Sequence, residues 1–438
     1  MSWSRIKHFL LAFLIVLSLF LSFQIWTAGG QYRQPSSTRS TTVTTSLADR
    51  TMAEVFSADR IIWHRNSIGR TVGSNAYHMR DWLSTVMETM EFGEVDTPEI
   101  ITYEEYEEFI STGNWVEFLF DAPIPFGLFS DTFENLPTDY ENRTFTRVYI
   151  NTDEPLEIGF YDSINEVRYS VDESNFTQDI IYDLLYSPDN EFREVERFEI
   201  GDKAIYLPVD EVEMEYRDYL VERLPNNLYI NHFFEDRSEV DGRRTGNTMR
   251  YIDLTTEVRI NDMTNTLTYL RQRTDLGQMT FSDRLLSSFR ELQMVENWTE
   301  TIQYHDYLPE NQQVIFQRHI QGYPVFSYQQ LESTIAITVV ESGLTDLILP
   351  IRVVQTPITL TGSSYKTLPS GSDVISLIES TELGLDAIQD IRLGLTWVES
   401  EEDERVVHYE PNWYIQTQDA WYEINRYIEL QEATINGL

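Results

Sequence analysis

"MSWSRIKHFLLAFLIVLSLFLSFQIWTAGGQY", residues 1–32, decides how the rest of the chain is organised. The run from Phe9 to Trp26 carries no charge. As a helix with a rise of about 1.5 Å per residue it would extend about 27 Å, close to the thickness of a bilayer's hydrocarbon core. The alternative is a cleaved signal peptide, but the candidate cleavage sites place Trp26 or Thr27 where a small residue is needed. We therefore expect a transmembrane helix over residues 9–28.

The charges that flank this run indicate its orientation. Arg5 and Lys7 precede it, whereas Arg33 and Arg39 follow it, so the positive-inside bias is mild. We expect residues 1–8 to form a cytoplasmic tail. The chain would then be a single-pass protein of the cell membrane, with its large remaining part extracellular.

Small polar side chains gather on one face of the predicted helix. Ser18 and Ser22 are four residues apart and in line with three aliphatic residues, and Gln24 lies near the outer end. Small residues at this spacing let helices approach closely, and their polar groups can bond between helices. One interpretation is a face that docks against another protein's helix, and the other is that serines are tolerated in a long anchor. The docking face would consist of Leu11, Ile15, Ser18, Ser22, Gln24 and Ile25.

The composition indicates an external location and excludes several classes of function. The chain has 72 acidic and 32 basic residues and a formal net charge of −40. Such a surface repels nucleic acid and anionic lipid headgroups, so nucleic-acid binding is excluded. Without cysteine the chain can form no disulfide, thiol nucleophile or cysteine metal site. Lysine occurs only at positions 7, 203 and 366, which suits a salty or alkaline exterior because arginine keeps its charge at high pH; the alternative is that the acidity serves solubility alone.

A Ser/Thr-rich stretch separates the predicted helix from the rest of the chain. Residues 36–46, SSTRSTTVTTS, have no apolar period, and we expect a flexible tether over residues 29–50. The remaining length and apolar content suit more than one domain. We expect three α+β domains, over residues 51–195, 196–300 and 301–438.

The first of these parts alternates between short strands and helices. Helical patterns occur at Tyr103–Ile110 and Gln178–Tyr186. Alternating apolar and polar residues predict strands over 115–120, 146–152, 157–162 and 165–172.

The later parts continue this mixture. A strand ends at Pro208, and Val212, Tyr216, Leu220 and Leu224 follow at i, i+4 spacing, which predicts a helix that the next proline stops. Extended segments begin again with NLYINHFF, and "DLILPIRVVQ" and "AWYEINR" are further predicted strands. Together the elements predict an α+β fold of mainly antiparallel sheets with packed helices. The remaining predicted elements are helices over Ser282–Trp298 and Asp373–Leu383 and a hairpin that turns at Gly322.

The motifs that could carry chemistry are incomplete. The seven histidines lack the spacing of a zinc protease. Ser363-x-x-Lys366 matches the nucleophile motif of penicillin-binding enzymes but lacks its two partner motifs. In residues 235–247, Arg237 and Val240 interrupt the alternate oxygen ligands of an EF-hand, which leaves a weak calcium loop as an open alternative.

Runs of acidic residues offer no better candidate. General acid catalysis needs a carboxyl with a raised pKa in a partly dry cleft. We expect the acids within residues 104–108 and 401–404 to lie on solvated faces instead. The sequence therefore predicts no catalytic, cofactor-binding or metal-ligating residues, and a protein that is not an enzyme.

Three features of the sequence are typical of one family: the membrane segment, VFSADRIIWHRN at residues 55–66, and GYPVFS and EPNWYI at residues 322–327 and 410–415. With these motifs and its cysteine-free remainder, the sequence resembles the YycH family over essentially its whole length. Members of this family are single-pass membrane proteins of low-GC Gram-positive bacteria. With their companion YycI they adjust the sensor histidine kinase WalK (YycG), which controls cell-wall metabolism.

The resemblance implies a fold, partners and a mechanism. It implies a multi-domain α+β ectodomain with a YycI-like C-terminal part, and no catalytic residues or cofactors. The expected partners are a YycI-like protein, a WalK-like kinase and the membrane, with a homodimer as a further expectation. Contacts of the transmembrane helices would carry the regulation. Two other classes stay open: a wall-acting hydrolase, and a ligand-binding module with a pocket lined by Trp413, Tyr414 and Trp421.

Overall fold

The structure is a computed structural model that describes most of the chain after Arg50. The described residues belong to one compact unit, Thr44–Leu438. No helix among them is long and apolar enough to cross a membrane. The predicted cytoplasmic tail, the predicted transmembrane helix with its docking face, and residues 29–49 of the predicted tether lie outside them. The described ranges are 50–75, 89–153, 156–171, 174–187, 190–201, 203–272, 279–296, 298–327, 329, 331–358, 364–381, 385, 387–418 and 420–435.

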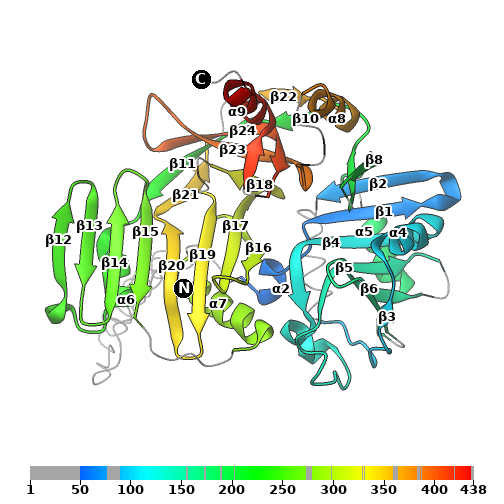
Figure 1. The fold of residues 1–438 in the computed structure, drawn as a ribbon, viewed down its shortest axis with the longest axis horizontal. Coiled ribbons are helices and arrows are strands. Elements are labelled where there is room, and N and C mark those ends of the chain that lie inside the picture. Colours follow the sequence, from blue (N-terminus) through cyan, green and yellow to red (C-terminus); the bar gives the residue numbers. More distant parts are fainter. Residues whose placement is uncertain are drawn as a thin grey trace, which may run out of the picture. The chain divides into compact units, whose positions relative to one another are not determined.

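The first sheet is antiparallel throughout and has nine strands in the order β3-β7-β6-β5-β4-β1-β2-β8-β9 (Figure 1). Both faces of its central strands are buried, because Val116 and Phe118 of β4 join the main core while Trp115 packs on the opposite face. Its strands are β1 (Arg60–Arg65), β2 (Arg70–Asn75), β3 (Glu99–Ile100), β4 (Asn114–Pro125), β5 (Thr144–Asn151), β6 (Ile158–Asp162), β7 (Val167–Ser170), β8 (Arg193–Ile200) and β9 (Lys203–Pro208).

Two predicted helices pack on this sheet, one on each face. Helix α4 (Tyr103–Thr112) begins with a capping box, in which Thr102 and Glu105 each accept a hydrogen bond from the other's backbone N–H. Its Tyr106 ring stacks on Tyr161 of β6 with centroids 3.9 Å apart. Helix α5 (Gln178–Tyr186) has the predicted bounds and contributes its apolar side chains to the main core.

The second sheet has 14 strands and is antiparallel apart from the parallel β18–β23 pair. Its path is β12-β13-β14-β15-β20-β19-β17-β18-β23-β24-β11-β21, with β16 beside β17 and β25 beside β24 (Figure 1). The strands are β11 (Arg217–Arg223), β12 (Asp241–Thr245), β13 (Thr248–Ile252), β14 (Thr256–Asn261), β15 (Thr266–Arg271), β16 (Thr301–Leu308), β17 (Gln313–Ile320), β18 (Tyr323–Phe326), β19 (Thr334–Val340), β20 (Gly343–Pro350), β21 (Arg352–Pro357), β23 (Asp390–Glu399), β24 (Val406–Gln416) and β25 (Trp421–Glu423).

A two-stranded sheet and several helices complete the described fold. Strands β10 (Val212–Glu215) and β22 (Tyr365–Leu368) pair only with each other. The predicted helix over Ser282–Trp298 is confirmed as α7 and ends at Val295, and the predicted helix over Asp373–Leu383 is confirmed as the shorter α8. Apart from α4 and α5, the described helices are α2 (Met52–Val55), α6 (Asn226–Phe233), α7 (Phe281–Val295), α8 (Gly371–Glu379) and α9 (Ile424–Ile435). The 3₁₀ turns are η1 (Asn66–Ile68), η2 (Phe126–Thr132) and η3 (Arg237–Glu239).

The predicted helix over Val212–Leu224 is wrong, because these residues form β10 and β11. A spacing of four residues places side chains on one face of a helix. It also places them on one face of a strand, because every second residue of a strand points to the same side. The burial follows the strand period, since Val212 and Met214 are buried and Glu213 between them is exposed.

The extended segment predicted at NLYINHFF is also wrong, because residues 226–233 form α6. Pro225 precedes this helix directly, and proline is tolerated at a helix start because the N–H groups there have no partner within the helix. The predicted strand AWYEINR is a strand only as far as Glu423, and α9 begins at Ile424. The predicted single strand DLILPIRVVQ is interrupted at Ile351 and belongs to β20 and β21.

Candidate functional site: a pocket where three sheets meet

The described chain begins with a segment, residues 50–59, that packs against distant parts of the sequence before it enters β1. We call it the leading segment. The Gln293 side chain of α7 donates a hydrogen bond to the Arg50 carbonyl oxygen (3.2 Å), and Gln303 of β16 donates one to the Ser57 hydroxyl (2.9 Å). The Phe56 ring is buried among three aromatic rings of α7, β16 and β17, those of Phe289, Tyr304 and Phe316.

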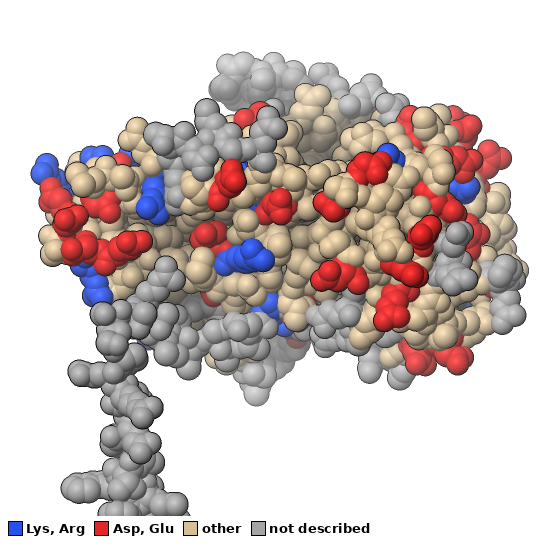
Figure 2. Space-filling model, turned by 90° about the horizontal axis from the view of Figure 1, so that it is seen from below, with Lys and Arg blue, Asp and Glu red and all other residues tan. Residues whose placement is uncertain are grey.

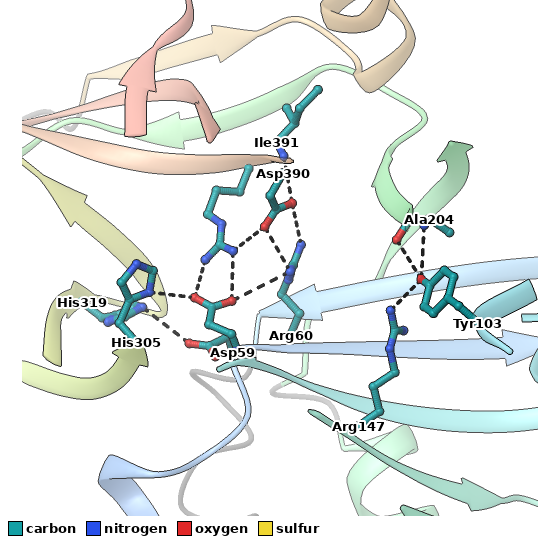
Figure 3. A network of polar contacts seen from close by, with 11 residues as sticks. Asp59, Arg60, Tyr103, Arg147, Ala204, His305, His319, Asp390 and Ile391 are labelled. Atoms are coloured by element: carbon teal, nitrogen blue, oxygen red, sulfur yellow. Dashed lines mark hydrogen bonds and ion pairs between the residues drawn. The ribbon is translucent and has the colours of Figure 1, made fainter. Parts of the chain in front are cut away.

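A buried network of charges, which we call the junction network, follows where the leading segment meets β1 (Figure 3). The Arg392 guanidinium of β23 donates two hydrogen bonds to the Asp121 carboxylate of β4, at 2.5 and 3.0 Å. Arg60 of β1 donates two to Asp390 of β23, at 3.3 and 3.4 Å. His305 Nδ1 of β16 lies 3.2 Å from Asp121 Oδ2. The first sheet is thus tied to the second by complementary charges removed from solvent.

Two neighbouring carboxyls in the junction network have opposite pKa shifts. Burial would raise the pKa of Asp121, but the charge of Arg392 and the hydrogen bond with His305 hold that pKa well below its ordinary value. Burial and then the charge of Asp121 raise the pKa of Asp59 well above its ordinary value. Asp59 Oδ2 accepts a hydrogen bond from the Asp121 backbone N–H at 2.9 Å. Asp121 therefore keeps its charge, and the next proton that the pair takes up goes to Asp59.

A pocket of about 420 Å³ lies beside the junction network, and Arg60 and Arg392 line it. All three sheets supply its walls: β1, β2, β8 and β9 of the first sheet, β10 and β22 of the two-stranded sheet, and β18, β23 and β24 of the second sheet. Aliphatic side chains from both large sheets face it, and further charged residues line it as well. The charged residues beyond the network are Glu191, Arg193, Glu213, Glu215 and Arg217.

A second buried polar cluster lies between α4 and the face of the first sheet that α4 covers. Glu117 of β4 accepts hydrogen bonds from the Tyr106 hydroxyl (2.8 Å) and from Arg147 (3.1 Å), and it pairs with His64 Nε2 at 2.6 Å. Burial opposes ionisation here, but Arg147 and His64 lower the pKa of Glu117 to about 2. Arg147 also donates to the Tyr103 hydroxyl (2.9 Å), which extends the cluster toward β9 (Figure 3).

The expectation that the acids within residues 104–108 are solvated is wrong for Glu107. Its side chain is buried and accepts hydrogen bonds from the Tyr206 hydroxyl (3.2 Å) and from Arg197 Nε (3.3 Å). Glu104, Glu105 and Glu108 are exposed, as expected. Glu107 faces inward because Tyr106 and Ile110 define the buried face of α4 and Glu107 adjoins that face.

A third buried cluster surrounds Arg318 of β17. Its guanidinium lies 3.4 Å from the Glu296 carboxylate and 3.3 Å from that of Glu300, and it donates to the Arg352 carbonyl oxygen at 3.0 Å. Glu300 also accepts a hydrogen bond from the Tyr409 hydroxyl at 2.8 Å. This cluster holds β17 against the chain after α7 and against β24.

Glu332→Gln is expected to stabilise the protein more at pH 8 than at pH 5. Burial outweighs the nearby charges of Arg352 and Arg318 and raises the pKa of Glu332 from its ordinary value of 4.5 to about 7. Because the pKa is higher in the folded state, ionisation of the carboxyl opposes folding, and its cost grows as the pH rises from about 4.5 to about 7. The difference in the free energy of unfolding between variant and wild type should grow by about 2 kcal/mol from pH 5 to pH 8. Urea unfolding measures it, with the exposed Glu401→Gln as control, and a pH-independent difference would contradict the prediction.

The sequence-predicted residues that the structure describes do not come together as one site. The docking face and Ser363 lie outside the described residues, and Lys366 donates to the Asn412 side chain at 2.6 Å. Of the three aromatic residues of the expected pocket, only Trp413 lines the one found. Tyr414 instead stacks on Phe326 at 3.8 Å, and Trp421 packs over the Arg392 guanidinium at 4.4 Å.

Residues 235–247, which left a calcium loop open, form η3, β12 and the turn after it. Asp236 accepts a hydrogen bond from the Ser238 N–H, and Asp241 pairs with Arg243 at 2.7 Å. Within the described ranges, no group of three or more histidine or acidic side chains could hold a metal ion.

The pocket and the junction network were missed because their parts are far apart in sequence. One signal was available, since Asp121 and Arg392 interrupt the apolar runs FLFDAPI and DIRLGL. A charged residue in such a run is buried only if it is paired. The sequence shows that partners are required but not which residues they are.

These observations define the class of protein as an α+β protein of antiparallel sheets, joined by buried ion pairs around a pocket. Residues 4–182 match the family model for the YycH protein, N-terminal domain, and residues 202–432 match that for the YycH protein, C-terminal domain. The chain therefore belongs to the YycH family, which confirms the resemblance seen in the sequence. Membership of this family of regulatory proteins links the chain to the WalK/YycG system.

A solved structure described as "Crystal Structure of YycH from Bacillus subtilis" has the same fold. The two chains superpose with a TM-score of 0.70 at 16% sequence identity, over 86% of this chain and 98% of the other. A comparison with curated protein sequences yields no match. The expected likeness of the C-terminal part to YycI and the three-domain division stay predictions.

Proposed function

We propose that the chain is a non-catalytic, membrane-anchored regulator that modulates the WalK (YycG) sensor kinase together with YycI, and thereby affects cell-wall metabolism. Family membership supports the regulatory role. The predicted helix over residues 9–28 would anchor the protein with its N-terminus in the cytoplasm. The part after the tether would lie outside the cell, where it would contact YycI.

The anchoring of the leading segment is the observation that best supports this proposal. The leading segment starts at residue 50, the last residue of the predicted tether; it is held by α7, β16 and β17 and continues into β1. A partner that binds either large sheet would therefore act on the same short segment. That segment would set where the tether leaves the ectodomain, and with it how the ectodomain is held relative to the membrane helix.

The helix itself would provide the contact with the kinase. A regulator shifts a two-state kinase only if it binds one signalling state more tightly than the other. A difference of about 1–3 kcal/mol changes the equilibrium by about 5–150-fold. The face of Leu11, Ile15, Ser18, Ser22, Gln24 and Ile25 would supply this difference through close helix packing and interhelical hydrogen bonds.

Residues 1–30 alone are expected to change kinase output in cells that carry a reporter for it. The double variant Ser18→Leu/Ser22→Leu should abolish the change, because two isobutyl groups keep the helices apart. Ala12→Leu is the matched control, since it also enlarges a small residue but lies about a third of a turn from the serine face. Replacement of the helix by an unrelated anchor should also abolish regulation by the full chain. If that exchange has no effect, the ectodomain carries the regulation and the helix proposal fails.

A further inference from the structure

We propose that the pocket where the three sheets meet binds a small amphipathic molecule with a single carboxylate. Arg193 would bind the carboxylate, and the aliphatic walls would enclose the apolar part. This inference goes beyond the proposed regulatory function and does not depend on it.

The pocket has the size and lining of a small-molecule site. Its volume of about 420 Å³ falls within the range of roughly 300–1,000 Å³ that is typical of ligand pockets, which occur preferentially between packed units. Apolar side chains from opposite walls face it, so a ligand with an apolar body would replace water there. Those that the argument uses are Ile62, Val195 and Leu207 of the first sheet and Leu393, Leu395 and Trp413 of the second.

Arg193 is the lining cation with the weakest internal partner. Among the described residues its closest carboxylate, that of Glu191, is 3.8 Å away, and the Glu191 side chain is 74% exposed. The Arg193 Nη1 donates one hydrogen bond to the Tyr323 hydroxyl at 3.3 Å. By contrast Arg217 lies 2.6 Å from the Glu215 carboxylate, and Arg60 and Arg392 are held by the junction network.

A guanidinium with this environment is suited to a carboxylate. Its planar fork offers parallel donors to the two oxygens, and such charge-assisted pairs are among the stronger hydrogen bonds in proteins. Arg193 is partly exposed, with 38% of its side chain accessible. A ligand can therefore reach it without displacing a buried ion pair.

Of the four arginines that line the pocket, Arg60, Arg217 and Arg392 each pair with a carboxylate, so Arg193 is the cation left to balance the charge of a ligand. Glu191, Glu213 and Glu215 line the same pocket, and the formal net charge of the chain is −40, which limits the ligand to one negative charge. Acidic side chains spread over the face seen in Figure 2 and outnumber the basic ones there. Coulomb repulsion grows in proportion to the charge of the ligand, so a dianion such as phosphate is repelled about twice as strongly as a carboxylate.

A ligand-observed NMR titration of the full chain in lipid nanodiscs tests the proposal. Octanoate is the probe, octanamide is the matched neutral molecule, inorganic phosphate is the dianion, and empty nanodiscs provide the blank. Octanoate should bind about tenfold or more tightly than octanamide, because a charge-assisted pair contributes about one factor of ten or more in affinity. Phosphate should bind more weakly than octanoate.

Three single variants assign the binding to the pocket. Arg193→Gln should weaken octanoate binding about tenfold and leave octanamide unchanged. Leu393→Trp, at a partly exposed lining position, should reduce the binding of both molecules by filling the apolar space. Arg243→Gln is the control, since this arginine is exposed on β12 and pairs with Asp241 outside the pocket. Circular dichroism and thermal unfolding of each variant establish that it is folded.

Each other outcome overturns the proposal. Equal binding of octanoate and octanamide excludes a carboxylate-specific site. Octanoate binding that survives Arg193→Gln or Leu393→Trp places the site elsewhere. If phosphate binds as tightly as octanoate, the site is not limited to ligands with one negative charge. If none of the probes binds, the pocket is not a binding site for such molecules. None of these results bears on whether the helix regulates the kinase, so the two proposals fail independently.

Discussion

Arg392→Ala is expected to lower the free energy of unfolding by about 3–5 kcal/mol, because it leaves buried carboxylates without their cation. Asp121 and Asp390 both accept hydrogen bonds from this guanidinium. Removing one partner of a buried pair costs more than the pair contributes, since the remaining charge stays out of water. Urea unfolding of the full chain in detergent, followed by tryptophan fluorescence, measures the loss.

The control is Arg405→Ala, which breaks a pair with Asp403 of similar length, 2.8 Å, on a side chain that is 78% exposed. Exposed pairs contribute about 0–1 kcal/mol, so this variant should unfold nearly as the wild type does. Equal losses in the two variants would mean that the junction network is not desolvated as the structure describes.

The effect of Arg392→Ala should become smaller in acid. The pKa of Asp121 in the folded protein lies well below its ordinary value of 3.8. A carboxyl with a lowered folded-state pKa stabilises the fold above its unfolded-state pKa, and this contribution is lost as the pH falls further. Wild type and variant should therefore differ fully at pH 7, and the difference should start to shrink only as the pH falls below about 4, toward the lowered pKa of Asp121. A difference that stays the same from pH 7 to pH 2 would show that packing, not charge, accounts for the loss.

Phe56→Ala is expected to cost about 3–5 kcal/mol and to release the leading segment. The side chain is 1% exposed and lies among Phe289, Tyr304 and Phe316, so its removal leaves a cavity between the leading segment and the strands that hold it. Hydrogen exchange of residues 50–59 in the full chain should become faster, because their anchoring is lost. The kinase reporter should respond less to the full chain if the leading segment transmits the signal.

Phe160→Ala is the matched control for this prediction. Phe160 is 2% exposed and packs on Phe126 of η2 and Phe145 of β5, neither of which belongs to the leading segment. It should cost a similar free energy of unfolding but leave the exchange of residues 50–59 at the wild-type rate. Equal exchange in the two variants would show that the leading segment follows global stability, with no role for its own contacts.

The sequence predicted those elements whose pattern has one interpretation. Helix α5 was predicted at its observed bounds, because Ile181, Leu184 and Leu185 repeat at helical spacing and no strand period fits them. Residues 212–224 were predicted as a helix because a spacing of four also fits alternate residues of two strands. The sequence does not predict the helix over residues 226–233, because Pro225 fits the end of one helix as well as the start of the next.

The candidate site could not be predicted, for a different physical reason. Arg60 and Asp390, which face one another in the junction network, are 330 residues apart in sequence. Local periodicity predicts which side of a strand is buried but not which strand lies opposite. Only the presence of charges inside apolar runs, as at Asp121 and Arg392, indicated that buried partners exist. The docking face remains a prediction, since it lies outside the described residues.

The contacts of the leading segment also bear on the order in which the protein folds. Residues 50–59 are synthesised before the rest of the described chain, yet Gln293, Gln303 and Phe316 hold them in place. Contacts between residues so distant in sequence close large loops, and such closure slows folding. Until β23 has been made, the Asp121 carboxylate lacks its guanidinium partner and favours exposure to water. The segment that is made first is thus anchored only after α7, β16 and β17 have been made, and the junction network closes later still, so a nascent chain without its C-terminal strands should depend on chaperones or be degraded.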